Sequence, residues 1–125
     1  ITCCSRSSND TALSALVAQI QTLAKLSGFK VAVEGGYPGW LPNMKSDLLK
    51  LSQTVFQELD EGKAPLVTAI HAGLECGLLG GLMPELDMIS FGPDIQDAHS
   101  PDESVSIVSV GTVAKQVGAL LEALC

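Results

Sequence analysis

The stretch PLVTAIHAGLECGLLGGLMPELDMISF, residues 65–91, decides the fold that the sequence predicts. It opens with an apolar run at residues 65–70 and closes with another at residues 86–91, and both are typical of buried strands. The glycine-rich connection between them, with a short helical turn, has the place of a crossover. Strand, crossover and strand in this order fit a parallel pair, so the stretch predicts an α/β fold.

Amphipathic helices are predicted on both sides of this stretch. Residues 13–23 carry apolar side chains at helical spacing, with cap residues before them in RSSND and Gly28 after them. Ser46 precedes a second apolar stripe, and a third stripe starts at about Ser109. We expect these helices to pack on a mostly parallel sheet.

The segment EGGYPGWLPN, residues 34–43, predicts a boundary between two domains. It holds three glycines and two prolines, and it follows FKVAV, residues 29–33, which alternates as a half-buried strand does. The charge balance changes at the same place, because residues 1–40 carry a net +1 and the remainder carries −8. We therefore expect one domain at residues 1–40 and another at residues 41–125.

Composition limits the partners that the chain can have. With 125 residues, 46% of them hydrophobic, it can bury a core of about one ordinary domain. Its net charge of −7 repels phosphate backbones and anionic lipid headgroups, so we expect neither nucleic acid nor membrane as a partner. Four cysteines without metal or disulfide spacing favour reduced thiols in the cytoplasm. The chain starts at Ile1 and not at Met, so we expect a piece of a longer protein.

One histidine stands in an acidic segment, DAHSPDE, which spans residues 97–103 and follows a predicted strand. Ligands of α/β proteins gather beyond the ends of strands, and a neutral imidazole binds zinc well when nearby carboxylates hold it in place. His99 is therefore a candidate metal ligand. The alternative is an exposed loop histidine among solvated acids, with SPDE serving as a cap.

Three other residues, Glu75, Gly77 and Arg6, are candidate substrate contacts. Glu75 lies between Gly73 and Gly77, where glycines permit close approach and a carboxylate could receive a substrate ammonium, or it complements a helix N-terminus. Arg6 could pair its guanidinium with a carboxylate, or it is a surface arginine beside a helix start. His71, directly after a predicted strand, is more simply a structural histidine. No catalytic residue is predicted, because no known motif completes an active site here.

Four segments, taken in order, resemble the C-terminal part of the aminoacyl-histidine dipeptidases: RSSND, YPGWLPN, HAGLECGLLG and DMISFGPDIQDAHSPDE. These enzymes belong to a clan of di-zinc metallopeptidases. The resemblance implies an α/β catalytic domain around two metal ions and an inserted lid domain that serves dimer contacts and substrate closure. On that pattern residues 1–40 correspond to a strand, helix and strand at the end of the lid, and residues 41–125 to the returning catalytic domain.

The resemblance also implies roles for single residues. His99 corresponds to the C-terminal metal ligand in the AHSPDE motif. Glu75 and Gly77 correspond to the segment that binds the amino end of the substrate, and Arg6 falls near a lid arginine that pairs with the substrate carboxylate. The other metal ligands and the general base of the family have no counterpart in this sequence. Asp97 is a departure, because the family pattern has glycine there.

We therefore expect part of a cytoplasmic, homodimeric zinc dipeptidase that hydrolyses aminoacyl-histidine dipeptides with metal-activated water. The isolated chain, with at most one ligand to the two zinc ions, is expected to be inactive. Two alternatives stay open. The chain could be a non-catalytic α/β interaction module, or part of an amidohydrolase of the same fold that acts on an acyl-amino acid.

Overall fold

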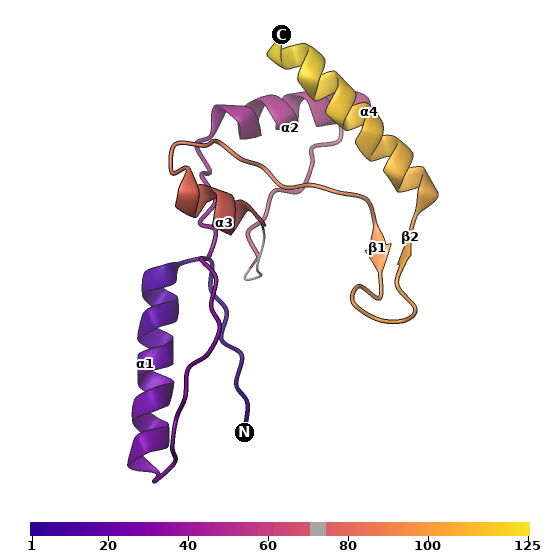
Figure 1. The fold of residues 1–125 in the computed structure, drawn as a ribbon. Coiled ribbons are helices and arrows are strands. Elements are labelled where there is room, and N and C mark those ends of the chain that lie inside the picture. The colour runs from indigo at the N-terminus through magenta and orange to yellow at the C-terminus, as the bar shows by residue number, and fades with distance from the viewer. Residues whose placement is uncertain (71–74) are drawn as a thin grey trace. The chain divides into compact units, whose positions relative to one another are not determined.

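The computed structural model describes residues 1–70 and 75–125 (Figure 1). Within these residues the chain forms four α-helices and one two-stranded antiparallel sheet. It divides into two compact units, each assembled from two segments that are separated in sequence. The predicted α/β fold is correct for the helices but wrong for the sheet, because the described residues contain no parallel sheet.

The predicted strands at residues 29–33, 65–70 and 86–91 are the source of this error. None of these segments is a strand in the structure, and Figure 1 draws them as unpaired chain. A strand exists only where its backbone hydrogen bonds meet a neighbour, whereas an apolar or alternating pattern shows only that one face could be buried. In the described part of the chain these segments meet no such neighbour.

The first unit consists of Ile1–Asn43 and Thr68–Leu86 and contains the helices α1 (Asp10–Leu26) and α3 (Glu75–Leu82). Helix α1 buries none of its residues fully, so its apolar stripe is covered only in part. Helix α3 is longer than the short helical turn that the sequence predicts. Its one buried residue is a glycine, which already indicates packing against backbone rather than against side chains.

Local capping groups explain why α1 forms where the sequence predicts it. The Asn9 side chain accepts a hydrogen bond from the Ala12 amide at 2.9 Å. At the other end Gly28 has a φ of +82°, and the Phe29 amide donates to the Ala24 carbonyl at 3.0 Å, which is the closing bond of a Schellman motif. Glycine adopts this left-handed conformation without steric cost, so the helix ends there.

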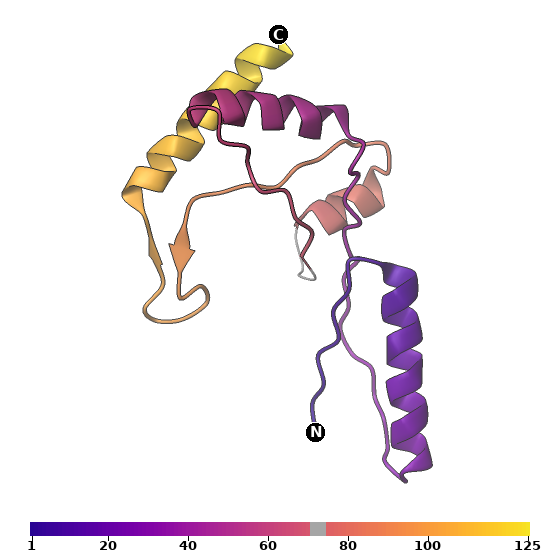
Figure 2. The ribbon, with the colours of Figure 1, turned by 180° about the vertical axis from the view of Figure 1, so that it is seen from behind.

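The second unit consists of Met44–Val67 and Asp87–Cys125. It contains α2 (Asp47–Leu59), the strands β1 (Ile95–Gln96) and β2 (Ser104–Val105), and α4 (Ile107–Leu124). The two strands form a hairpin that leads directly into α4 (Figure 2). The predicted domain boundary near Leu41 stays a prediction, since compactness of these units does not test it.

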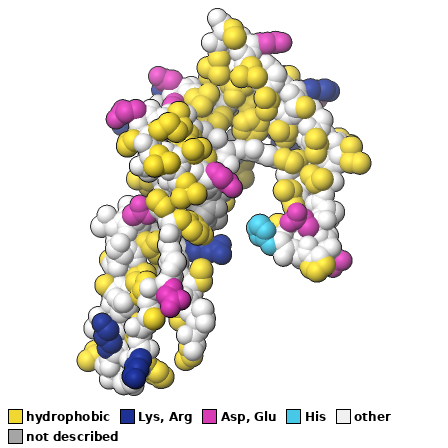
Figure 3. Space-filling model, in the orientation of Figure 1, with side chains coloured by type: hydrophobic (Ala, Val, Ile, Leu, Met, Phe, Trp, Pro, Cys, Tyr) yellow, Lys and Arg dark blue, Asp and Glu magenta, His cyan; other side chains and the backbone are white. Residues whose placement is uncertain are grey.

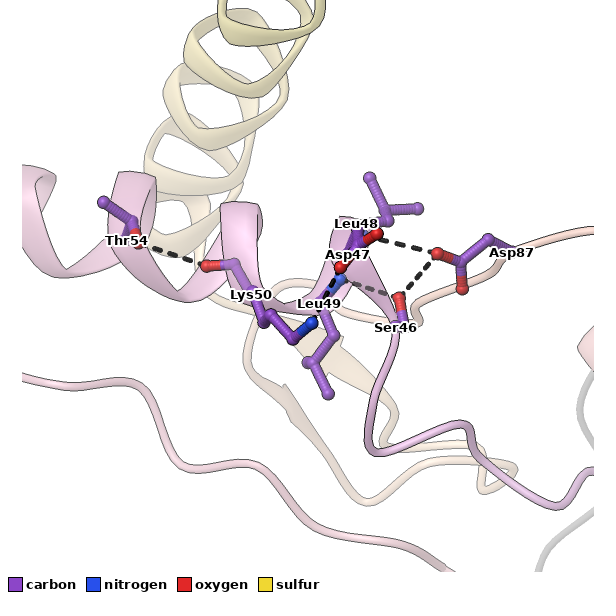
Figure 4. Close-up of polar contacts among 7 residues, drawn as sticks. All are labelled: Ser46, Asp47, Leu48, Leu49, Lys50, Thr54 and Asp87. Carbon is purple, nitrogen blue, oxygen red and sulfur yellow. Dashed lines mark hydrogen bonds and ion pairs between the residues drawn. The ribbon is translucent and has the colours of Figure 1, made fainter.

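The N-terminus of α2 joins the two segments of the second unit (Figure 4). The Ser46 hydroxyl caps the helix by accepting from the Leu49 amide at 2.9 Å, as the sequence predicts, and it donates to Asp87 Oδ2 at 2.7 Å. Asp87 Oδ2 also accepts from the Leu48 amide at 3.3 Å. Ser46 is only 3% exposed, so its two bonds are partly shielded from water, whereas the bond from the Leu48 amide to Asp87 is exposed.

The core of the second unit lies between α2 and α4. Phe56 packs its ring against Phe91 with the centroids 4.9 Å apart and the planes at 60°. The buried apolar side chains and those packed on them are Val55, Phe56, Leu120, Leu48, Leu51, Ile89 and Ala119. Helix α4 thus covers another helix and not the sheet that the sequence predicts.

Hydrophobic side chains lie open along α4 (Figure 3). Ile107 is 86% exposed and Val108 is 81% exposed. By length and composition alone the 18 residues of α4 could cross a membrane. One such helix is weak support for a membrane protein, because the core helix of a larger soluble protein has the same features. The predicted lack of a membrane partner therefore stays a prediction.

Candidate metal-binding loop

The hairpin of β1 and β2 frames the loop that contains His99. Directly before β1 and after β2, the two arms of the hairpin are joined by the Ser106 amide, which donates to the Asp94 carbonyl at 3.0 Å. The Asp94 amide in turn donates to Ser109 Oγ at 2.9 Å, and Ser109 lies in the first turn of α4. The base of the hairpin that carries the loop at residues 97–103 is thereby fixed to the N-terminus of α4.

Two successive turns shape the loop itself. The Ser100 amide donates to the Asp97 carbonyl at 3.1 Å, and the Glu103 amide donates to the Ser100 carbonyl at 3.2 Å. The Asp102 amide adds a bond to Ser100 Oγ at 3.1 Å. Serine and aspartate favour such turns because their short polar side chains bond to the nearby backbone.

Two residues of this loop have left-handed backbone conformations. Asp97 has a φ of +50° and His99 a φ of +66°. For a residue with a side chain this conformation costs about 1–2 kcal/mol, although aspartate tolerates it better than most residues. Glycine would adopt it freely, so the departure at Asp97 from the resembled pattern lies where glycine has a conformational advantage.

The backbone of His99 is held by a carboxylate while its side chain is open. The His99 amide donates to Glu103 Oε2 at 2.6 Å, and the residue as a whole is exposed. No described residue bonds to either ring nitrogen of His99, so the imidazole is open to ligate a metal ion. Among residues 1–70 and 75–125 no group of three or more potential ligands gathers. The chemistry of the loop therefore fits one zinc ligand and not a whole site.

Glu75 and Gly77 lie on α3 in the first unit, whereas His99 belongs to the second. Glu75 is the exposed first residue of the helix, a position that suits either a substrate ammonium or the helix dipole. Gly77 is buried, and a Cβ on it would meet the Pro38 carbonyl oxygen and lie 3.4 Å from Gly39. Its lack of a side chain therefore serves the packing of α3 on residues 38–39, and a substrate role remains a prediction.

Arg6 is exposed and precedes α1 in the first unit. A hydrogen bond with the Cys4 side chain and, after it, the electrostatic influence of the Cys4 and Tyr37 side chains raise the pKa of Arg6. Because arginine is already cationic at any physiological pH, the shift leaves its charge unchanged. His71 and Gly73 lie outside the described residues.

Sequence reasoning did not identify the contact between Glu103 and the His99 amide. The sequence signal is a glutamate four residues after the histidine, with the turn-forming residues Ser, Pro and Asp between them. That spacing is equally compatible with SPDE serving as a cap, so only the folded loop shows that Glu103 accepts a hydrogen bond from the His99 amide.

Comparison with known proteins finds similarity to dipeptidases. No protein family model matches the chain. The cytosol non-specific dipeptidase of Escherichia coli (strain K12) is 45% identical over 111 residues, which cover 89% of this chain and 23% of the relative. The crystal structure of aminoacylhistidine dipeptidase from Vibrio alginolyticus superposes with a TM-score of 0.76 at 40% identity, covering 94% of this chain and 24% of that one. The chain thus spans about a quarter of the length of the relatives it matches.

Proposed function

We propose, on the premise that this chain is homologous to a segment of the aminoacylhistidine dipeptidases, that it forms the C-terminal portion of a zinc-dependent dipeptidase. The observation that carries the proposal is the match across nearly the whole chain in both sequence and backbone. In this assignment His99 supplies one metal ligand. The exposed imidazole, without a partner among the described residues, supports that role.

Zinc, when bound, would polarise the peptide carbonyl and activate a water molecule. The residues of this chain would hold the metal ion and orient the substrate. His99 would bind the metal through a ring nitrogen, Glu75 would receive the substrate ammonium beside Gly77, and Arg6 would pair with the substrate carboxylate. The remaining ligands and the general base would come from parts of the dipeptidase that these residues do not supply, so the 125-residue chain alone is expected to be inactive.

The substrate class proposed is dipeptides with a C-terminal histidine. One relative is named an aminoacylhistidine dipeptidase and the other a non-specific dipeptidase, so the breadth of the preference is itself a question. The word cytosol in the name of the E. coli relative supports a cytoplasmic location. A homodimer remains part of the proposal on the strength of the lid pattern alone.

A chimeric enzyme tests this function. In it, residues 1–125 replace the matching quarter of the E. coli dipeptidase, and hydrolysis of an Xaa-His dipeptide is compared with hydrolysis of a dipeptide that lacks histidine. We expect zinc-dependent turnover by the chimera and none by the 125-residue chain. Turnover by the chain alone would contradict its incompleteness. A chimera that folds and binds zinc but cleaves only acyl-amino acids would favour an amidohydrolase instead.

A further inference from the structure

His99 is held in a conformation that its own backbone disfavours. With φ at +66° it lies in the left-handed region, and Asp97, two residues earlier, lies there too at +50°. A histidine persists in this region only where surrounding contacts compensate for the steric cost. Because the residue is exposed, side-chain packing does not provide those contacts.

The Glu103 carboxylate provides the most direct compensation. Its Oε2 accepts a short hydrogen bond from the His99 amide at 2.6 Å, and bonds to a charged acceptor are stronger than those between neutral groups. The amide of Glu103 itself closes the turn with the Ser100 carbonyl at 3.2 Å. Glu103 is therefore bound through both its backbone amide and its side chain, although the residue itself is exposed.

We infer that Glu103 is a positioning residue for His99: by holding the amide, its carboxylate fixes the left-handed turn and thereby the position from which the imidazole reaches a metal ion. This inference rests on the proposed function, because it assigns Glu103 a role toward the same ligand. A loop ordered before binding loses less conformational freedom when the metal binds, so its affinity is higher.

A merely structural role for Glu103 would predict a different pattern. If Glu103 only stabilised the hairpin, its replacement would loosen the strands and the turns equally. If Glu103 positions His99, its replacement loosens only the loop, and a neutral acceptor of the same shape restores the loop conformation. Glu103→Gln keeps a side-chain oxygen at the same place, whereas Glu103→Ala removes the acceptor.

The experiment is amide hydrogen exchange and nuclear Overhauser measurement by NMR on the metal-free 125-residue chain. In the unmodified chain we expect the strong intraresidue HN–Hα effect at His99 that positive φ produces. Glu103→Ala should abolish it and accelerate exchange of the His99 amide roughly tenfold. Glu103→Gln should recover most of the protection. Asp102→Ala is the matched control, because it removes one charge from the same loop at a carboxylate that accepts no hydrogen bond from the described residues, and it leaves the bond from the Asp102 amide to Ser100 in place.

A second measurement links the loop to the metal. In the chimeric dipeptidase, Glu103→Ala should weaken zinc binding by about 10- to 100-fold, with Glu103→Gln and Asp102→Ala close to the parent. An unchanged His99 conformation in Glu103→Ala would overturn the inference whatever the zinc result. If the loop changes as expected but His99→Ala retains zinc, the proposed function fails while the contact between Glu103 and His99 stands.

Discussion

Gly77 offers the sharpest test of the packing in the first unit. A methyl group added there would approach the Pro38 carbonyl oxygen more closely than the 3.0 Å below which real Cβ atoms essentially never lie. The obstacle is backbone and not the end of a flexible side chain, so either residues 38–39 or helix α3 must shift. Gly77→Ala should therefore destabilise the contact between them.

The magnitude follows from comparison with a second glycine of the same helix. At Gly81 a new Cβ would lie 3.7 Å from Pro38 Cγ, which is ordinary van der Waals contact. Both changes gain the helix propensity of alanine over glycine, about 1 kcal/mol in a helix interior. That gain cancels in the difference between the variants. The difference then reports the forced overlap alone, and we expect Gly77→Ala to be about 1–3 kcal/mol less stable than Gly81→Ala.

Hydrogen exchange of the α3 amides is the suitable assay, because it reports the opening of one helix and not the unfolding of both units. Gly81→Ala should slow exchange in α3 or leave it unchanged, while Gly77→Ala should accelerate it. Equal exchange in the two variants would refute the close approach of α3 to Pro38. It would also remove the packing explanation for the buried glycine and leave its predicted substrate role as the simpler account.

Three further predictions concern the caps, the loop and the surface. Ser46→Ala removes both the bond from the Leu49 amide and the bond to Asp87, and should cost about 1–2 kcal/mol in urea unfolding. Asp87→Ala should cost less, because it keeps the Leu49 bond and loses, besides the bond from Ser46, only the longer, exposed bond from the Leu48 amide at 3.3 Å. Asp97→Gly should slow amide exchange in the loop by an amount equivalent to about 0.5–1 kcal/mol. Glycine relieves the left-handed strain, but its greater freedom in the unfolded chain cancels part of that gain. Faster exchange would show that the aspartate side chain stabilises the loop more than the positive φ destabilises it. Lys50 lowers the pKa of Asp47 through a 2.7 Å contact between their charged groups. Any stability from this exposed pair is therefore present above the ordinary pKa of aspartate and is lost as the pH falls through the lowered value. The urea midpoint of Lys50→Ala should lack that pH dependence, and high salt should weaken the dependence in the unmodified chain.

The helices could be predicted from sequence because their determinants are local. Asn9 and Ser46 bond to amides only three residues away, and Gly28 supplies the conformation that ends α1. The sheet could not be predicted, because strand pairing depends on a partner that is often distant in sequence. The segment at residues 65–70 has a strand-like composition and no paired neighbour among the described residues.

In the candidate site, too, some features could be predicted from the sequence and others arise only on folding. The AHSPDE motif identifies His99 as a candidate ligand, because the types of its residues and their order can be read directly from the sequence. The bond from the His99 amide to Glu103 and the positive φ at Asp97 arise only when the hairpin closes. Gly77 shows the reverse case, in which a residue singled out for substrate binding has a clear packing role at the Pro38 carbonyl.

The zinc content of the chimeric dipeptidase shows whether His99 is a metal ligand. Metal per protein would be measured by elemental analysis after dialysis for the chimera, for His99→Ala and for the Asp102→Ala control, with circular dichroism to confirm that all three fold. The account predicts that His99→Ala loses bound zinc while Asp102→Ala keeps the content of the parent chimera. Full zinc occupancy in a folded His99→Ala chimera would contradict the assignment of His99 as a metal ligand.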